Sequence, residues 1–467
     1  LRRIDGVFAA VIYDARRRRV HLVTDRHGLR PLYWTVHHGQ LAWASEVKAF
    51  LALPTFRPKI NVGLTDAFFE GGFLIGDGTW FEGAELLPYA AVLTWELATR
   101  QPRIERYWSF DSVKPIAEPI DEQALAEELG ARFIESVRRR WDACEDVGIT
   151  LSGGLDSRAI LAAAPNHGPP IPTFTFGVAG CTDLRIARRA ARVKGARHQF
   201  FELSEANWLA PRIEGIWLSD GMLNLLHMHG LERFHYTREP AINLNGFLGD
   251  ALLGGSYIGF RNWPVEKTFQ NRGRRFILIG LQPGQAFIHQ RMPFFANDLL
   301  DLTLAIPESV RQHSHIYNKM LLQCFPTYYR RISWQKTRVP IGCPCYRAAM
   351  LLAVKRLWNR LGIEARRFGL PYRDPNRFHD YPQWIRRQPA RAFFTNLLRD
   401  RNALYPEYVS RTRVLDTLQA HMAGADHSEL LCRYLTFELF LQQTFKRRYR
   451  QSSEWISGGE ASHDPSS

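Results

Sequence analysis

The sequence predicts an α/β protein built from a β-rich N-terminal part, a parallel, doubly wound α/β part and a helical C-terminal part. Short apolar or alternating runs separated by turn residues fill the first 110 residues, which is typical of strands. Between residues 147 and 245, strand-like runs alternate with helical stretches of about 10 to 15 residues, the pattern of a parallel sheet. From about residue 276 to residue 450 the pattern is mainly helical, with breaks marked by proline.

The N-terminal part is expected to form short antiparallel strands, and residues 16–19, a run of four arginines, to form a hairpin tip. Residues 111–121 are polar and contain two prolines, so we predict a linker there. Residues 1–110 and 122–450 then form two domains. The strands expected before the linker are 6–13, 20–24, 32–36 and 40–44.

The second domain begins with an amphipathic helix over 122–141 that leads into a buried strand over 147–151. Further strands are expected at 173–176, 198–203 and 241–245, and helices at 183–194 and 206–218. Ligands of parallel sheets bind beyond the carboxyl ends of the strands, where the loops after residues 151 and 245 fall. The polar stretch 451–467 is expected to be a disordered tail.

The composition is that of a globular protein, with 45% hydrophobic and 23% charged residues. The formal charge of +15 comes with nine lysines and 52 arginines. Such a charge is compatible with nucleic-acid binding or with an arginine-rich coding bias. Because the arginines are scattered and form no aromatic-interleaved stripe, we expect no nucleic-acid partner.

No apolar stretch approaches the roughly 18 residues of a membrane span, so we expect no membrane partner either. The six cysteines form no disulfide ladder and no paired Cys-x-x-Cys zinc pattern. This indicates reduced thiols and a cytoplasmic protein. The chain starts at Leu1 without an initiator methionine, so we expect that an N-terminal piece precedes it.

The most informative motif is Ser152-Gly153-Gly154-Leu155-Asp156-Ser157, placed between a strand and an Ala/Leu/Ile helix. The two glycines allow a tight turn and close approach of a ligand. The amides at a helix N-terminus favour an anion, and the two serine hydroxyls add donors. An acidic residue is a poor partner for phosphate, so we expect Asp156 to hold Mg²⁺ against it. The alternative is an ordinary glycine-rich turn.

The motif is not a Walker A loop, because no Gly-Lys-Ser/Thr follows. It resembles the pyrophosphate loop (PP-loop) of the N-type ATP pyrophosphatases, which cut ATP between the α and β phosphates. This resemblance implies an adenine-nucleotide α-hydrolase-like fold.

Nearly the whole chain resembles asparagine synthetases of the B type. Residues 4–14, 25–33 and 44–49 match strand and turn segments of an Ntn-type class II glutamine amidotransferase domain, and we interpret them as structural. In that family the nucleophile is an N-terminal cysteine, whereas the first cysteine here is Cys144. We therefore expect a truncated amidotransferase domain, and no glutamine hydrolysis by this chain.

In the synthetase half, the resemblance implies that Leu151 and Phe176 contact the adenine and ribose of ATP, with a further contact at Asn245-Gly246. The family's Ser-Gly-Glu-Gly-Ser-Asp segment corresponds to residues 245–250 here. Asp250 is then a second Mg²⁺ ligand beside Asp156, the two clamping a metal that neutralises the leaving pyrophosphate. The alternative for Asp250 is an N-cap.

The sequence departs from the family at Phe247. Asparagine synthetases have glutamate there, and the related β-lactam synthetases have tyrosine. Phenylalanine can do neither job, so both asparagine and a lactam formed by the tyrosine route are in doubt as products. Ala251 also replaces a family acid.

Residues 334–342 resemble the family's Arg-Gln-Lys…Gly-Val-Gly segment, whose lysine stabilises the adenylate and the later tetrahedral intermediate. The resemblance therefore makes Lys336 a candidate catalytic residue. A compact ammonium serves this role differently from a guanidinium, and lysine is scarce in this chain. The alternative is a surface lysine.

Three functions remain open. The first is an ATP- and Mg²⁺-dependent ligase that adenylates a small-molecule carboxylate and transfers ammonia or an amine to it, as asparagine synthetase does. The second is a tailoring synthetase that closes a lactam or peptide ring of a natural product. The third is a non-catalytic, regulatory or binding descendant of the fold. The oligomeric state is open, a homodimer included.

Overall fold

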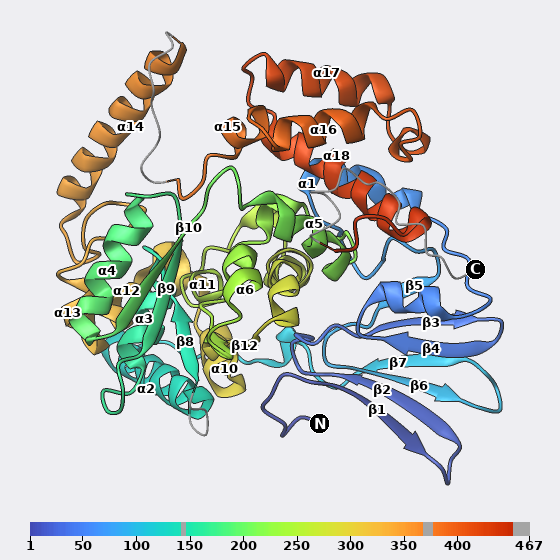
Figure 1. Cartoon of the computed structure of the whole chain (residues 1–467). Helices are drawn as coiled ribbons and strands as arrows, with labels where there is room; N and C mark the ends of the chain where they lie inside the picture. Colours follow the sequence, from blue (N-terminus) through green and yellow to red (C-terminus); the bar gives the residue numbers. More distant parts are fainter. Residues whose placement is uncertain (142–145, 368–376, 452–467) are drawn as a thin grey trace.

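The computed structural model describes residues 1–141, 146–367 and 377–451 (Figure 1). Two antiparallel sheets form the N-terminal part. The first pairs in the order β1-β2-β6-β7 and the second in the order β4-β3-β5. The strands are β1 (Ala9–Asp14), β2 (Arg19–Thr24), β3 (Tyr33–His37), β4 (Gln40–Ala44), β5 (Ala84–Leu86), β6 (Ala91–Glu96) and β7 (Pro102–Arg106).

The predicted short antiparallel strands of the N-terminal part are confirmed, and β4 has the predicted bounds. The turn between β1 and β2 contains Arg16, Arg17 and Arg18, as expected of a hairpin tip, and Arg19 is the first residue of β2. Helix α1 (Thr65–Gly71) and strands β5 to β7 had no predicted bounds. The first two residues of the expected linker, 111–121, belong to a short 3-10 helix (Phe110–Ser112), and residues 113–121 form neither helix nor strand.

Five parallel strands form the central sheet, in the order β10-β9-β8-β11-β12. Their bounds are β8 (Val147–Thr150), β9 (Pro172–Gly177), β10 (Arg197–Glu202), β11 (Ile242–Leu244) and β12 (His289–Arg291). The predicted doubly wound order is therefore confirmed. Beyond residue 276 the chain is mainly helical, as predicted; the three-residue strand β12, which is defined by its pairing with β11, was not predicted.

Helices follow the strands as the pattern predicts. They are α2 (Glu122–Trp141), with the predicted bounds, α3 (Asp156–Ala163), α4 (Thr182–Lys194), α5 (Leu209–Leu218), α6 (Leu231–Thr237) and α7 (Gly249–Leu252). Helix α3 packs on α4, and α2 packs against α10 (Asn297–Ala305) and α12 (His315–Cys324). Leucine, isoleucine and alanine side chains from α2, α3 and β8 are buried together beneath the candidate site.

Helices predominate in the rest of the described chain, which also contains β12. It contains α8 (Val265–Thr268), a π-helix (Phe269–Leu278), α9 (Ile279–Leu281), α10 (Asn297–Ala305), α11 (Glu308–Arg311), α12 (His315–Cys324), α13 (Pro326–Tyr329), α14 (Cys345–Arg367), α15 (Tyr381–Arg386), α16 (Ala390–Arg399), α17 (Arg411–Met422) and α18 (Ser428–Leu441). Helix α14 projects from the body (Figure 1). Residues 452–467, most of the expected tail, lie outside the described residues.

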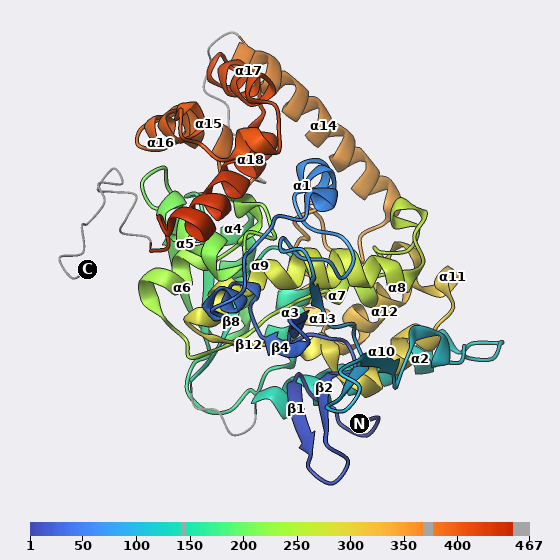
Figure 2. The ribbon, with the colours of Figure 1, turned by 90° about the vertical axis from the view of Figure 1, so that its right-hand side faces the viewer.

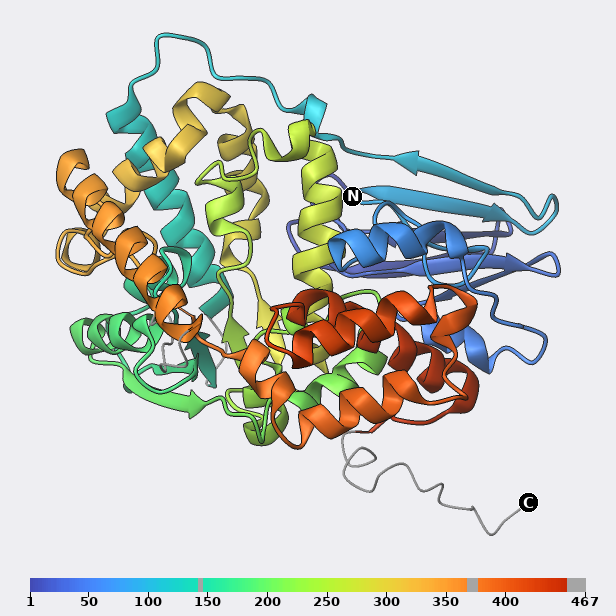
Figure 3. The same cartoon turned by 90° about the horizontal axis from the view of Figure 1, so that it is seen from above.

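The N-terminal sheets and the C-terminal helices are not independent units. Helix α18 lies beside α1 and α5 (Figure 2). Trp80 of the N-terminal part stacks on Phe440 of α18 at 5.9 Å between ring centres. Seen from above, the C-terminal helices bridge the N-terminal sheets and the α/β part (Figure 3). One continuous hydrophobic core therefore joins the first and last parts of the chain.

Candidate active site

The Ser-Gly-Gly loop connects β8 to α3 at the carboxyl end of the parallel sheet, where the sequence placed it. Leu151 is buried, and its N–H donates to the carbonyl of Phe174 at 2.8 Å. The N–H of Ser152 donates to Oγ of Ser157 at 3.1 Å, and the N–H of Gly154 donates to Oγ of Ser152 at 3.1 Å. The two hydroxyls thus tie the ends of the loop together.

A residue that the sequence analysis missed, Asp183 of α4, holds the loop from the other side. Its Oδ1 accepts from the N–H of Gly153 at 2.7 Å, and its Oδ2 accepts from Nε2 of Gln335 at 2.8 Å. The N–H of Gln335 also donates to the carbonyl of Gly153. A methyl group at Gly153 would lie 2.9 Å from Cβ of Gln335, so this contact requires glycine. The segment that contains Lys336 therefore packs against the loop.

The two carboxylates proposed as metal ligands lie beside each other. Oδ2 of Asp156 accepts from the backbone N–H of Asp250 at 2.9 Å, and Oδ1 accepts from the hydroxyl of Tyr317 at 2.8 Å. Burial, and next the charge of Asp250, raise the pKa of Asp156 from 3.8 to about 7. Tyr317 is fully buried and was not predicted, since nothing in its local sequence marks it.

Glycines surround this carboxylate pair. A methyl group at Gly249 would lie 2.7 Å from Cγ of Asp156, and one at Gly254 would lie 2.6 Å from Oδ1 of Asp250. A methyl group at Gly246 would lie 3.0 Å from Cβ of Asp156. The glycines of the 245–255 segment therefore allow the two carboxylates to approach each other.

This arrangement fits a divalent cation. Mg²⁺ binds through one or two carboxylates together with phosphate oxygens and water. A cation between Asp156 and Asp250 would offset the repulsion that raises the pKa of Asp156. The described residues contain no cluster of three or more His, Cys, Asp or Glu side chains suited to a metal, so phosphate and water would complete the coordination.

The N-cap alternative for Asp250 is wrong. Leu248 occupies the N-cap position of α7, and Asp250 lies inside the first turn of this helix. Its Oδ1 is 3.5 Å from the hydroxyl of Ser314.

The other predicted positions lie around the same edge of the sheet. Phe176 is near the end of β9, where its ring contacts Phe378 at 5.8 Å between ring centres. Asn245 follows β11, and its N–H donates to the carbonyl of Arg291 at 2.9 Å. Phe247 is 3% exposed and packs on Phe295 at 5.2 Å, so it presents no polar group to the site.

Lys336 is exposed, with Nζ 5.2 Å from the ring centre of Trp334. Its neighbour Gln335 places the backbone next to Gly153. The structure therefore brings Lys336 to the rim of the loop. Its catalytic role remains a prediction.

Comparison with known proteins accounts for this arrangement. Residues 1–108 match the Glutamine amidotransferase domain family, and residues 128–277 match the Asparagine synthase family. The chain belongs to the asparagine synthase family, with an N-terminal glutamine amidotransferase domain. The second match covers β8, the Ser-Gly-Gly loop and the segment that contains Asp250.

Curated relatives are about 30% identical to this chain over the aligned residues. A Mycobacterium tuberculosis protein provisionally named a glutamine-hydrolysing asparagine synthetase is 31% identical over 270 residues, 55% of this chain and 40% of the relative. Amidase chry2 of Gibberella zeae is 29% identical over 299 residues, 57% of this chain and 43% of the relative. Asparagine synthetase 3 of Bacillus subtilis is 31% identical over 165 residues, 35% and 26% of the two chains. The alignments thus span less than half the length of these relatives.

A search of residues 1–141, 146–367 and 377–451 for helices long and apolar enough to cross a membrane finds none.

Proposed function

We propose that this chain is an ATP-dependent ligase that adenylates a carboxylate and transfers an amine to it. The observation that carries the proposal is the position of the Ser-Gly-Gly loop beside the Asp156–Asp250 pair at the carboxyl end of a parallel sheet. Free amides at the start of α3 suit phosphate oxygens, and the carboxylate pair suits Mg²⁺. Membership of the asparagine synthase family supports the same chemistry.

Two displacements make up the reaction. A carboxylate oxygen of the substrate attacks the α-phosphorus of ATP, and the bond to the bridging oxygen breaks to release pyrophosphate. The amine then attacks the carbonyl carbon of the acyl-adenylate, AMP leaves, and the nitrogen loses a proton. Mg²⁺, when bound, neutralises charge on the departing pyrophosphate. Leu151, Phe176 and the segment Asn245-Gly246 are proposed to contact the nucleoside.

Within this chain, the amides at the start of α3 would orient the phosphates, and Asp183 keeps the loop in place. Lys336 stands at the rim, where its ammonium group would stabilise the adenylate and the tetrahedral intermediate. We expect ammonia or a free amine to serve as the nitrogen donor.

Phe247 favours a product other than asparagine. The residue at this position handles amine chemistry in the relatives, and here it is a buried aromatic ring. A tailoring synthetase for a natural product is therefore the second candidate. We expect a small-molecule carboxylate, with no nucleic-acid or membrane partner, in a cytoplasmic protein.

The test is release of AMP and pyrophosphate by the purified chain from ATP, Mg²⁺ and a panel of carboxylates, with ammonia or simple amines. Release that depends on one carboxylate and is lost in Asp156→Asn supports the ligase. Binding of ATP without release under any condition would instead support the non-catalytic descendant. An active Asp156→Asn variant would exclude the proposed metal site.

A further inference from the structure

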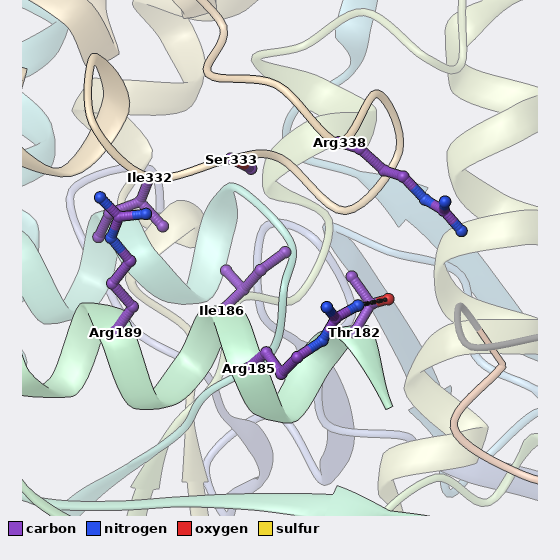
Figure 4. A pocket seen from close by; sticks show the side chains of 7 residues that line it. All are labelled: Thr182, Arg185, Ile186, Arg189, Ile332, Ser333 and Arg338. Carbon is purple, nitrogen blue, oxygen red and sulfur yellow. Dashed lines mark hydrogen bonds between the residues drawn. The ribbon is translucent and has the colours of Figure 1, made fainter. Parts of the chain in front are cut away.

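A cavity of about 310 Å³ opens between α4 and the segment 332–338 (Figure 4). Arginines line both walls: Arg185 and Arg189 project from α4, and Arg338 belongs to the opposite segment. The other lining residues are apolar or carry a hydroxyl, and no described acidic residue is among them. We refer to this cavity as the arginine pocket.

The arginine pocket adjoins the Ser-Gly-Gly loop without being part of it. Helix α4 starts just after β9 ends, so its first turns lie at the carboxyl end of the sheet. Asp183 in the first turn of α4 and Gln335 of the opposite segment both bind Gly153. Each wall of the pocket is thus anchored to the same loop residue.

The two arginines of α4 are placed where helix electrostatics disfavours them. Arg185 and Arg189 are four residues apart and share one helix face, where like charges repel. Arg185 also lies near the helix N-terminus, where the dipole disfavours a cation. No described acidic residue pairs with either side chain, and Arg185 donates only to the hydroxyl of Thr182, at 3.0 Å. A bound anion would offset both effects.

The opposite wall carries a further local conflict. Arg338 has φ of +64°, a left-handed conformation that non-glycine residues rarely adopt. Its N–H donates to the carbonyl of Trp334 at 2.7 Å, which closes the turn that carries it to the pocket. This conformation fixes the course of the turn that places Arg338 at the pocket.

We propose that the arginine pocket binds an anionic group of the substrate, a carboxylate or a phosphate, separate from the carboxylate that is activated and from the phosphates of ATP. Guanidinium groups bind both anions through paired, charge-assisted hydrogen bonds. The inference rests on the proposed function, and it restricts the substrate class to acids that carry a second negative group.

Binding provides the first test. Isothermal titration calorimetry would measure the affinity of the purified chain for tricarballylate, a carboxylate probe, and for glycerol 3-phosphate, a phosphate probe. We expect one probe to bind the parent, and the double variant Arg185→Gln/Arg189→Gln to bind it about tenfold to hundredfold more weakly, since two charge-assisted contacts are lost. The control, Arg188→Gln, removes an exposed arginine of the same helix that does not line the pocket, and should bind as the parent does.

The same titrations with Mg²⁺ and a non-hydrolysable ATP analogue present separate the pocket from the nucleotide site. Simultaneous binding of probe and analogue supports the proposal, and the probe that binds identifies carboxylate or phosphate as the group. Mutual exclusion would assign the pocket to ATP phosphates and overturn it. Unchanged affinity in the double variant, or an equal loss in the control, would also overturn it.

Turnover provides an independent test once a substrate is known. The double variant should raise the KM for an acid with a second anionic group about tenfold, with the KM for ATP unchanged. If the parent releases no AMP with any acid, the proposed function fails while the titrations still test the pocket. If turnover prefers neutral monocarboxylates, the pocket proposal fails and the ligase stands.

Discussion

Replacing Asp156 by asparagine tests the carboxylate pair most directly, because it removes the charge and keeps the shape. The carboxylate accepts hydrogen bonds from the N–H of Asp250 and from the hydroxyl of Tyr317. Asparagine keeps one acceptor and places its NH₂ toward the other partner. The hydroxyl of Tyr317 can turn to accept from that NH₂. We therefore expect the variant to fold.

The pKa of Asp156 determines how much the substitution changes the stability of the fold. Burial and the charge of Asp250 raise it from 3.8 in the unfolded chain to about 7 in the folded, metal-free chain. Because the folded-state pKa is the higher one, the ionised carboxylate destabilises the fold. The resulting loss of folding stability is absent below about pH 4, grows up to about pH 7, and is complete above it. At about 1.4 kcal/mol per pKa unit it is on the order of 4 kcal/mol.

Thermal unfolding followed by circular dichroism would measure this loss. In EDTA near pH 8 we expect Asp156→Asn to have the higher Tm, and its advantage should shrink by more than half near about pH 5. Mg²⁺ should raise the Tm of the parent and leave that of the variant unchanged, since only the parent retains the charged pair. Parallel pH profiles for the two proteins, or an equal response to Mg²⁺, would refute this account of the pair.

Three further substitutions address other contacts. Gly249→Ala would place a methyl group 2.7 Å from Cγ of Asp156. It should lower the free energy of unfolding by about 1–3 kcal/mol and reduce AMP release. The control Gly6→Ala, whose methyl group would meet no atom within 4 Å, should do neither. Lys336→Ala should slow product formation by about 10²- to 10³-fold with the KM for ATP nearly unchanged, and Lys336→Arg should restore part of it; parental turnover would make the lysine a surface residue. Glu232→Leu removes the counter-ion of Arg212, its fully buried partner at 2.5 Å, and should cost about 3–5 kcal/mol in urea unfolding; a parental midpoint for this variant would contradict this.

Elements with a strong local pattern could be predicted from the sequence. Helix α2 and strand β4 have the predicted bounds, because amphipathic spacing and alternation are visible within each segment. Strand β12 could not be predicted in this way, since its three residues are defined by pairing with β11. The same holds for the shared core of the N-terminal sheets and α18, which joins segments from the two ends of the chain.

The candidate site shows the same division. The loop and Asp156 were predicted from glycine spacing and an acidic residue at a helix start, which are local signals, whereas Asp250 was proposed from the resemblance of residues 245–250 to a family segment. Tyr317 and Asp183 were missed because their roles depend on tertiary contacts: Tyr317 lies 161 positions from the carboxylate that it binds. A buried hydroxyl or carboxylate that completes a site carries no signature in its own segment.

Phe247, where the sequence departs from the family, is buried among other aromatic side chains. Its ring contacts Phe295, which in turn packs on Phe269, so the position faces an apolar cluster and not the loop. A glutamate there would be buried without a partner, which disfavours its charged form. Restoring the family's residue alone would therefore not restore its chemistry. In the ligase that we propose, the proton lost by the amine would pass to a group elsewhere in the site or to solvent.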